Sequence, residues 1–255
     1  MSEEEILSVH RVVQSARLQM LTDTNRQEAF NTTLTILSAC FPRQKSGDHM
    51  NADWNDCERF FAHVLAFDTA VQNWNPVLAD YEAYINLICD VTWYLWEIGQ
   101  YDEALGRLNW IEEICEKTIG LDTLEAARVY VNRGSVFSSL NRYDEAGQLF
   151  QKGLTIRQTL LPADDQLLGN SYMQVGNYYA SQGKIEEAIR SHRQVIRIRE
   201  SSPETPPGIM IISYFNICRC LLLGTQLAEA ERMLEMAQLW ENKLNQEESL
   251  YHKNG

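Results

Sequence analysis

A short motif recurs in this chain at a fixed interval, and no other feature of the sequence constrains the fold as strongly. The motif occurs in four segments: Tyr101-Asp102-Glu103-Ala104, Tyr143-Asp144-Glu145-Ala146, Ile185-Glu186-Glu187-Ala188 and Leu227-Ala228-Glu229-Ala230. Its alanines stand at positions 104, 146, 188 and 230, which defines a 42-residue period. A chain with such a period is expected to fold as a stack of similar units in which neighbours supply each other's core.

Two more positions repeat in the same register. A small residue stands twelve positions before each alanine, and an apolar or aromatic residue stands sixteen before it. The two sets are Thr92, Gly134, Gly176, Cys218 and Ile88, Tyr130, Tyr172, Tyr214. Helices that cross closely need a small side chain at the crossing, because a larger one holds the backbones apart. The acidic residues before each alanine suit the first turn of a helix, where the helix dipole stabilises negative charge. Each unit is therefore predicted to be a helical hairpin.

The predicted turns of these hairpins contain Gly99, Asn141, Gly183 and Gly224, residues that tolerate the left-handed conformation at the end of a helix. The four hairpins are expected at residues 82–118, 123–160, 165–200 and 207–244. A segment with three prolines at 201–207 is the clearest helix break in the chain. The pattern predicts an all-α solenoid.

This arrangement of a small residue, an aromatic residue, a turn and Asp/Glu-Glu-Ala resembles the tetratricopeptide repeat. The best example is Tyr172-x-x-x-Gly176-x-x-Tyr179-x-x-x-Gly183-x-x-x-x-Ala188. The usual period of that repeat is about 34 residues, so each unit here has about one extra turn in each helix. The longer period is similar to that of kinesin light chains and of tetratricopeptide arrays in large signal-transduction ATPases. The resemblance covers about residues 82–244 and implies a right-handed α-α superhelix.

Residues 1–80 do not share the 42-residue register. Thr24 and Gln27 form a capping-box signature for a helix that is expected to end near Cys40. The segment 54–64 has helical spacing and is expected to form a degenerate first hairpin with the helix before it.

The chain is thus predicted to have three parts. Residues 1–80 form an N-terminal helical region that caps the solenoid, residues 81–245 form four repeats, and residues 246–255 form a polar tail. A solenoid needs such coverage at its ends because a terminal unit lacks one neighbour.

Two phrases before the repeats resemble fungal NOD-like proteins, which combine an NB-ARC or NACHT nucleotide-binding domain with tetratricopeptide repeats. Val9-His10-Arg11-Val12-Val13-Gln14 resembles the end of their winged-helix-like domain. Trp54-x-x-Cys57 with Ala62-His63-Val64 resembles the segment that opens their repeat region, with Ala62 in place of a proline. The resemblance implies a sensor or scaffold region that works with a nucleotide-binding domain upstream or in trans. No G-x-x-x-x-G-K-[S/T] phosphate loop is present, so the nucleotide chemistry is not implied.

The overall charge argues against a nucleic-acid partner. The chain has 22 Lys plus Arg against 35 Asp plus Glu, a formal net charge of −13. Proteins that read duplex nucleic acid use clustered basic residues to displace counterions from phosphates. We therefore expect a protein or peptide partner.

The cysteines and the terminal segments point to a cytoplasmic protein without a membrane span. None of the six cysteines has C-x-x-C spacing, and we expect reduced, buried thiols; they are Cys40, Cys57, Cys89, Cys115, Cys218 and Cys220. The N-terminus is acidic where a secretory signal would be basic. The apolar stretch at 209–223 contains three polar residues and is expected to be a buried helix.

No known catalytic or metal-binding constellation is present, and we expect no catalytic residue, metal or cofactor. His10 and His63 have no companion at metal spacing and are interpreted as structural histidines. Asp48, His49 and Asp53 precede Cys57, but their spacing matches no standard metal frame.

In stacked hairpins the first helices line a concave groove, and the register identifies its positions. They hold Asn86, Asp90, Trp93, Arg128, Asn132, Ser135, Asn170, Gln174, Asn177, Ile212, Asn216 and Arg219. This set is rich in amides, which donate and accept hydrogen bonds and can pair with the backbone of an extended peptide. The alternative, that a solvated groove is simply polar, stays open.

The leading hypothesis is therefore a non-catalytic protein-interaction module that binds a peptide or protein in its concave groove. A second hypothesis is a cargo adaptor similar to kinesin light chains, although no heptad segment precedes the repeats. A hydrolase or transferase is the third, and the sequence supplies no constellation for it.

Overall fold

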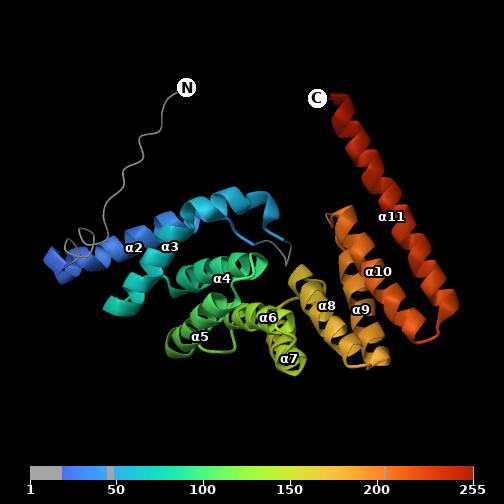
Figure 1. Cartoon of the computed structure of the whole chain (residues 1–255), viewed down its shortest axis with the longest axis horizontal. Coiled ribbons are helices and arrows are strands. Elements are labelled where there is room, and N and C mark those ends of the chain that lie inside the picture. The colour runs from blue at the N-terminus through green and yellow to red at the C-terminus, as the bar shows by residue number, and fades with distance from the viewer. Residues whose placement is uncertain (1–18, 45–48, 204, 255) are drawn as a thin grey trace.

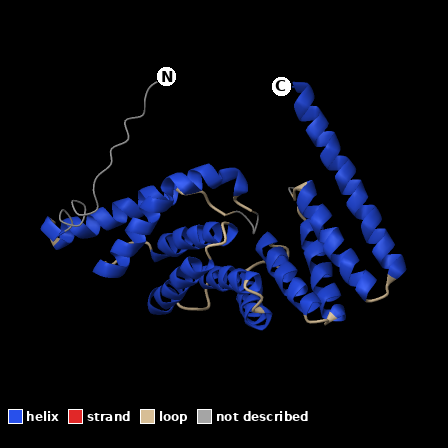
Figure 2. Ribbon diagram, viewed as in Figure 1, coloured by secondary structure: helices blue, strands red, loops and turns tan. Residues whose placement is uncertain are grey.

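The computed structural model describes residues 19–44, 49–203 and 205–254. Over these ranges the regular structure is entirely helical, and the helices are arranged as an elongated stack (Figure 1, Figure 2). The predicted all-α solenoid is confirmed. The phrase at residues 9–14 lies outside the described residues.

Three elements precede the repeats: α2 (Asp23–Cys40), the 3-10 turn η1 (Asn51–Asp53) and α3 (Trp54–Trp74). Helix α2 begins slightly earlier than predicted, because Thr22 and not Thr24 is the N-cap; its Oγ1 accepts from the N–H of Asn25 at 3.3 Å. Helix α2 packs against α3 and also against the first repeat helix. These helices share one apolar core with the first repeat.

Four hairpins follow, close to their predicted bounds. They are α4 (Tyr81–Glu97) with α5 (Tyr101–Thr118), α6 (Leu124–Ser139) with α7 (Tyr143–Leu160), α8 (Gln166–Ser181) with α9 (Ile185–Glu200), and α10 (Pro207–Leu223) with α11 (Leu227–Asn254). Helix α11 is longer than the other second helices and continues through the segment predicted as a polar tail. Figure 1 shows its C-terminal part extending past the N-terminal end of α10.

The repeated small residues lie where the two helices of a hairpin touch. The alanines at 104, 146, 188 and 230 are at most 2% exposed. A Cβ added at Gly134 would lie 2.6 Å from the ring of Phe150, and one at Gly176 would lie 2.9 Å from the ring of His192. The close helix crossing therefore explains the small residues at these two positions.

The hairpin turns also repeat, with one correction. Gly99, Asn141 and Gly183 have φ angles of +79°, +60° and +70°. In the fourth hairpin the left-handed residue is Thr225 (φ +59°), one full period after Gly183, and the predicted Gly224 has φ −83°. Gly224 has a packing role instead, since a Cβ there would lie 3.3 Å from the Ile185 side chain of the preceding hairpin.

Neighbouring hairpins are joined by buried arginines at equivalent positions. Arg157 on α7 donates through Nη1 to Oγ of Ser171 on α8 at 2.7 Å. Arg199 on α9 makes the same contact with Ser213 on α10 at 2.5 Å. Both the arginines and the serines are separated by one full period, so the same polar link connects consecutive repeats.

Candidate functional site

The predicted groove residues lie on the first helices of the hairpins, α4, α6, α8 and α10. The predicted groove residues fall into two groups. Those on α4 and α6 are engaged in contacts within the chain, and several on α8 and α10 are more open.

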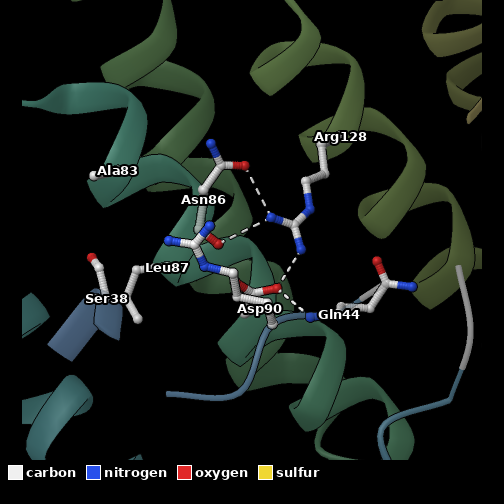
Figure 3. A pocket seen from close by; sticks show the side chains of 8 residues that line it. Ser38, Gln44, Ala83, Asn86, Leu87, Asp90 and Arg128 are labelled. Carbon is white, nitrogen blue, oxygen red and sulfur yellow. Dashed lines mark hydrogen bonds and ion pairs between the residues drawn. The ribbon is translucent and has the colours of Figure 1, made fainter. Parts of the chain in front are cut away.

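Asp90 on α4 lies at the centre of the engaged group (Figure 3). It is 4% exposed and forms an ion pair with Arg128 of α6. The N–H of Gln44 donates to Asp90 Oδ1 at 2.8 Å, and Arg128 Nη1 also donates to Asn86 Oδ1 at 2.9 Å. Burial raises the pKa of Asp90, and the nearby Arg128 guanidinium opposes that rise.

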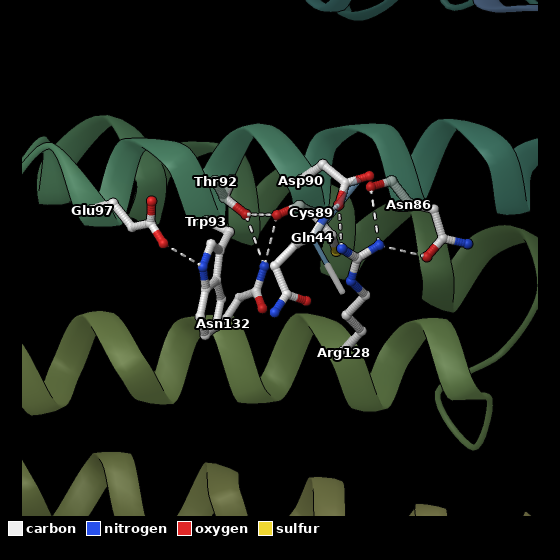
Figure 4. Close-up of polar contacts among 9 residues, drawn as sticks. All are labelled: Gln44, Asn86, Cys89, Asp90, Thr92, Trp93, Glu97, Arg128 and Asn132. Atoms are coloured by element: carbon white, nitrogen blue, oxygen red, sulfur yellow. Dashed lines mark hydrogen bonds and ion pairs between the residues drawn. The ribbon is translucent and has the colours of Figure 1, made fainter. Parts of the chain in front are cut away.

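Asn132 is enclosed between α4 and α6 (Figure 4). It is 4% exposed, and its Nδ2 donates to the carbonyl of Cys89 at 2.8 Å and to Oγ1 of Thr92 at 3.2 Å. Ser135, also on α6, is 4% exposed and donates to the carbonyl of Val131. The Asn132 contacts join α6 to α4 and stabilise the packing of one repeat on the next, whereas the Ser135 bond lies within α6.

Glu97, at the end of α4, is a contact residue that the register did not identify. Its side chain is 2% exposed. The carboxylate accepts from Trp93 Nε1 at 2.9 Å, from the N–H of Met50 at 2.8 Å and from Trp54 Nε1 at 2.8 Å. Glu97 stands one turn after Trp93, which is the only sequence signal that could have indicated it.

Residues on both sides of positions 45–48 therefore contact α4. Phe41 and Met50 are each 3% exposed. The backbone N–H groups of Gln44 and Met50 bond to Asp90 and Glu97, respectively. The predicted groove residue Asp90 is thus already bonded to the protein's own backbone.

Two small cavities adjoin this contact. One of about 140 Å³ lies beside Arg128 and is also lined by Ser38, Gln44, Asn86 and Asp90 (Figure 3). The other, of about 290 Å³, lies between α2 and the start of α4. Both are smaller than most pockets that enclose a small-molecule ligand.

The α8 and α10 part of the groove is more open. Asn170 Oδ1 accepts from Arg199 Nη2 at 2.9 Å, and Asn177 Oδ1 accepts from Arg219 Nη2 at 3.4 Å. Gln174 and Asn216 are half-buried, and no side-chain hydrogen bond of either is found within the described part of the chain. Ile212, at the outer end of this row, is 51% exposed.

One register position summarises the difference between the two groups. Asp90, Asn132, Gln174 and Asn216 follow each other at 42-residue intervals. The first two make buried hydrogen bonds within the protein. The last two present amide donors and acceptors at the open part of the groove.

The histidines are placed differently from the prediction. His63 is exposed on α3 and has no core role, which corrects the interpretation above. Among the histidines whose burial is described, the buried one is His192 on α9, which is 1% exposed. Burial, with smaller contributions from Arg219 and Arg199, lowers the pKa of His192 to about 4.

Five of the six cysteines are buried, as predicted, and Cys40 is exposed at the end of α2. Burial raises the pKa of the Cys57 and Cys89 thiols to about 12 and that of Cys115 to about 11. Such thiols are weak nucleophiles and poor metal ligands. Within the described residues no group of three or more His, Cys, Asp or Glu could hold a metal ion.

Comparison with known families agrees with this geometry. The tetratricopeptide-repeat model matches residues 124–201, the segment of α6 to α9. These residues are tetratricopeptide repeats. The described hairpins on either side share their register, and together they form one solenoid of repeats similar to those of kinesin light chains.

Two curated relatives share part of the sequence. The Arabidopsis thaliana "Protein KINESIN LIGHT CHAIN-RELATED 3" is 34% identical over 117 residues, which is 46% of this chain and 17% of the relative. The Candida albicans "Clustered mitochondria protein homolog" is 27% identical over 134 residues, which is 52% of this chain and 10% of the relative. The chain thus spans less than a fifth of either relative.

Solved structures share the fold at low sequence identity. BtubC (BKLC) from P. vanneervenii has a TM-score of 0.63 at 12% identity, over 88% of this chain and 93% of that one. A Podosopora anserina structure of nearly identical, kinesin-light-chain-type TPR-like repeats has a TM-score of 0.61 at 14% identity, over 89% and 99% of the two chains. Among the described helices, none has the length and apolar character required to cross a membrane.

Proposed function

We propose that this protein is a non-catalytic interaction module that binds an extended segment of a partner protein along α8 and α10. The groove there contains the amides of Gln174 and Asn216, which are not used in hydrogen bonds to other described side chains. An extended peptide offers alternating N–H and C=O groups, and an amide side chain can bond to either.

The observation that carries this proposal is the contact between the protein's own backbone and α4. Gln44 and Met50 donate their N–H groups to Asp90 and Glu97 on the concave side of the first repeat. Asp90 occupies the same register position as Gln174 and Asn216. The backbone N–H groups bonded at the first repeat thus offer a model for a ligand backbone bound at the third and fourth.

For the biological setting we propose the sensor or scaffold region of a fungal NOD-like signalling protein in the cytoplasm. The support is the order of the two phrases at residues 9–14 and 54–64 before the 42-residue repeats. Its regulatory partner would be a nucleotide-binding domain upstream or in trans.

A cargo adaptor similar to kinesin light chains is the second candidate. The partial match to the Arabidopsis thaliana relative favours it. A protein ligand in the groove is common to both candidates. Reconstitution with a nucleotide-binding domain and with a motor complex would distinguish them.

The groove proposal can be tested by selecting a random peptide-display library on the purified chain. We expect the selection to enrich peptides that bind the chain. Their affinity should fall at least about tenfold in the double variant Gln174→Ala, Asn216→Ala. The reason is that two lost hydrogen bonds of about 0.7 kcal/mol each weaken binding by about this factor. Gln148→Ala is the matched control, since Gln148 is an exposed amide on the second helix α7. Equal binding by the double variant and the control would contradict the groove as the site.

A further inference from the structure

Two amide side chains of α2 hold a non-helical segment of the chain by its backbone. Gln27 donates through Nε2 to the carbonyl of Val77, and its Oε1 accepts from the N–H of the same residue at 3.1 Å. Asn31 Oδ1 accepts from the N–H of Ala79 at 3.0 Å. Four residues of a helix rise about 6 Å and two residues of extended chain about 6.6 Å, so amides four residues apart match alternate residues of an extended segment.

These contacts involve the backbone and leave the bonded residues' side chains free. Val77 is 74% exposed and Ala79 is exposed as well, whereas Leu78 between them is 3% exposed. Gln27 uses both ends of its amide on one residue, and this requires that residue to have an N–H. Proline has none. A contact of this kind therefore tolerates any amino acid except proline.

One register position of the groove also contacts a backbone group in each of the first two repeats. Asp90 accepts from the N–H of Gln44 at 2.8 Å, and Asn132 donates to the carbonyl of Cys89 at 2.8 Å. Gln174 occupies this position in the third repeat, with a described hairpin on either side. No side-chain hydrogen bond of Gln174 is found within the described part of the chain. Because its amide both donates and accepts, Gln174 can bind a backbone N–H and a C=O together.

We propose that Gln174 binds one residue of the partner by both its N–H and its C=O, as Gln27 binds Val77. This inference rests on the groove proposed above and specifies its ligand. The ligand is an extended segment that lacks proline at the contacted residue and is not selected by the side chain there. Proline-rich segments are excluded, because they offer too few backbone N–H groups. Gln174 is the one glutamine among the predicted groove residues, and its side chain is longer than that of the asparagines.

The first measurement tests the contact within the chain and needs no partner. Hydrogen exchange of the Val77 N–H, followed by NMR, should be at least about tenfold faster in Gln27→Ala than in the wild type, because the acceptor of that N–H is lost. Gln148→Ala on α7 is the matched control and should leave this exchange unchanged. Equal exchange of Val77 in Gln27→Ala and in the wild type would remove the model for the contact and overturn the proposal.

The second measurement uses the full chain and a peptide enriched from the display library. Each backbone N–H of the peptide is methylated in turn, and each residue is replaced in turn by alanine. We expect one residue at which N-methylation weakens binding at least about tenfold, while alanine changes it less than about twofold. In Gln174→Ala the same N-methylation should cost less than about twofold, because the acceptor of that N–H is already absent. Gln148→Ala should retain the full cost.

Gln174→Glu keeps an acceptor for the N–H and removes the donor to the C=O. It should bind the peptide more weakly than the wild type and still respond to N-methylation. An N-methylation cost that is the same in Gln174→Ala and in the wild type would overturn the proposal, and so would an alanine effect as large as that of methylation. Both results leave the groove itself standing as long as the Gln174, Asn216 double variant loses affinity. A library that yields no binding peptide overturns both proposals.

Discussion

The internal interfaces of the solenoid and its C-terminal end contain the same register positions in different surroundings. Gly147, Ile189 and Glu231 are equivalent in sequence, and the first two lie against a following helix whereas the third is exposed. Asn132 and Asn216 are equivalent too, and only Asn132 is enclosed between two first helices. A repeat position therefore has no fixed energetic role, because the residues that the neighbouring hairpins place around it decide that role.

The largest expected effect is a loss of stability at the register position that Gly147 and Glu231 share. The surroundings of this position differ most between the interior of the stack and its last hairpin. Gly147→Ile should destabilise the protein by about 3 kcal/mol, because the new side chain collides with the ring of Tyr178. Glu231→Ile places the same side chain at the open end and should change the free energy of unfolding by less than about 0.5 kcal/mol. Urea denaturation of both variants measures the difference. Similar losses in the two would contradict the role given to the neighbouring helix.

A smaller, pH-dependent effect is expected at His192. Leu108, Phe150 and Leu234 occupy its register position in the other repeats, and both ring nitrogens of His192 lack a hydrogen-bond partner among the described residues. Its folded-state pKa of about 4 lies below the unfolded value of about 6.5. The unfolded chain therefore binds a proton first as the pH falls, and stability that is present above pH 6.5 is lost toward pH 4.

His192→Phe should remove about 2 kcal/mol of the stability lost between pH 7.5 and 4.5. Leu234→His, at the 40% exposed equivalent position on α11, should add almost no pH dependence, because a solvated imidazole has similar pKa values in the two states. Denaturation midpoints at the two pH values measure both. If the stability of His192→Phe falls between pH 7.5 and 4.5 as much as that of the wild type, other groups cause the acid sensitivity.

The smallest expected effect is a difference in stability between alanine substitutions at the two equivalent asparagines, Asn132 and Asn216. Asn132→Ala should cost about 1 kcal/mol, because it removes the buried hydrogen bonds to the Cys89 carbonyl and to Thr92. Asn216→Ala should leave the thermal midpoint within about 1 °C of the wild-type value, since this amide contributes no hydrogen bond to another described side chain. A loss of stability in Asn216→Ala equal to that in Asn132→Ala would remove the distinction between the engaged and the open groove.

Much of the fold was predictable because the repeat has local causes. The 42-residue period placed the four hairpins close to their observed bounds. Small residues such as Gly134 and Gly176 indicated the helix crossings, since only the partner helix limits their size. The left-handed turn residue of the fourth hairpin was predicted wrongly at Gly224, because glycine suits such a turn. The 42-residue spacing from Gly183 points to Thr225.

The candidate site was less predictable because burial depends on neighbours distant in sequence. The same polar pattern gave Asp90, Asn132, Gln174 and Asn216 as groove residues, and it could not show that the segment around Gln44 lies across the first of them. Glu97 has no distinguishing motif of its own. Its role follows from Met50 and Trp54, which are brought to it from outside the repeats.

The order of amino acids was enough to specify the repeating hairpins and the positions that face the groove, because helix periodicity, small residues and turn residues act over a few turns of chain. Tertiary packing then settled which of those positions are free. At the N-terminal end, backbone N–H groups of residues 44 and 50 bond to carboxylates on α4. On the last described hairpin, Leu222 and Leu227 are exposed, whereas their counterparts Ala180 and Ile185 pack against a core cluster that includes Ile217 of α10. Whether a side chain is buried or free depends on what packs against it, and that is a property of the assembled chain.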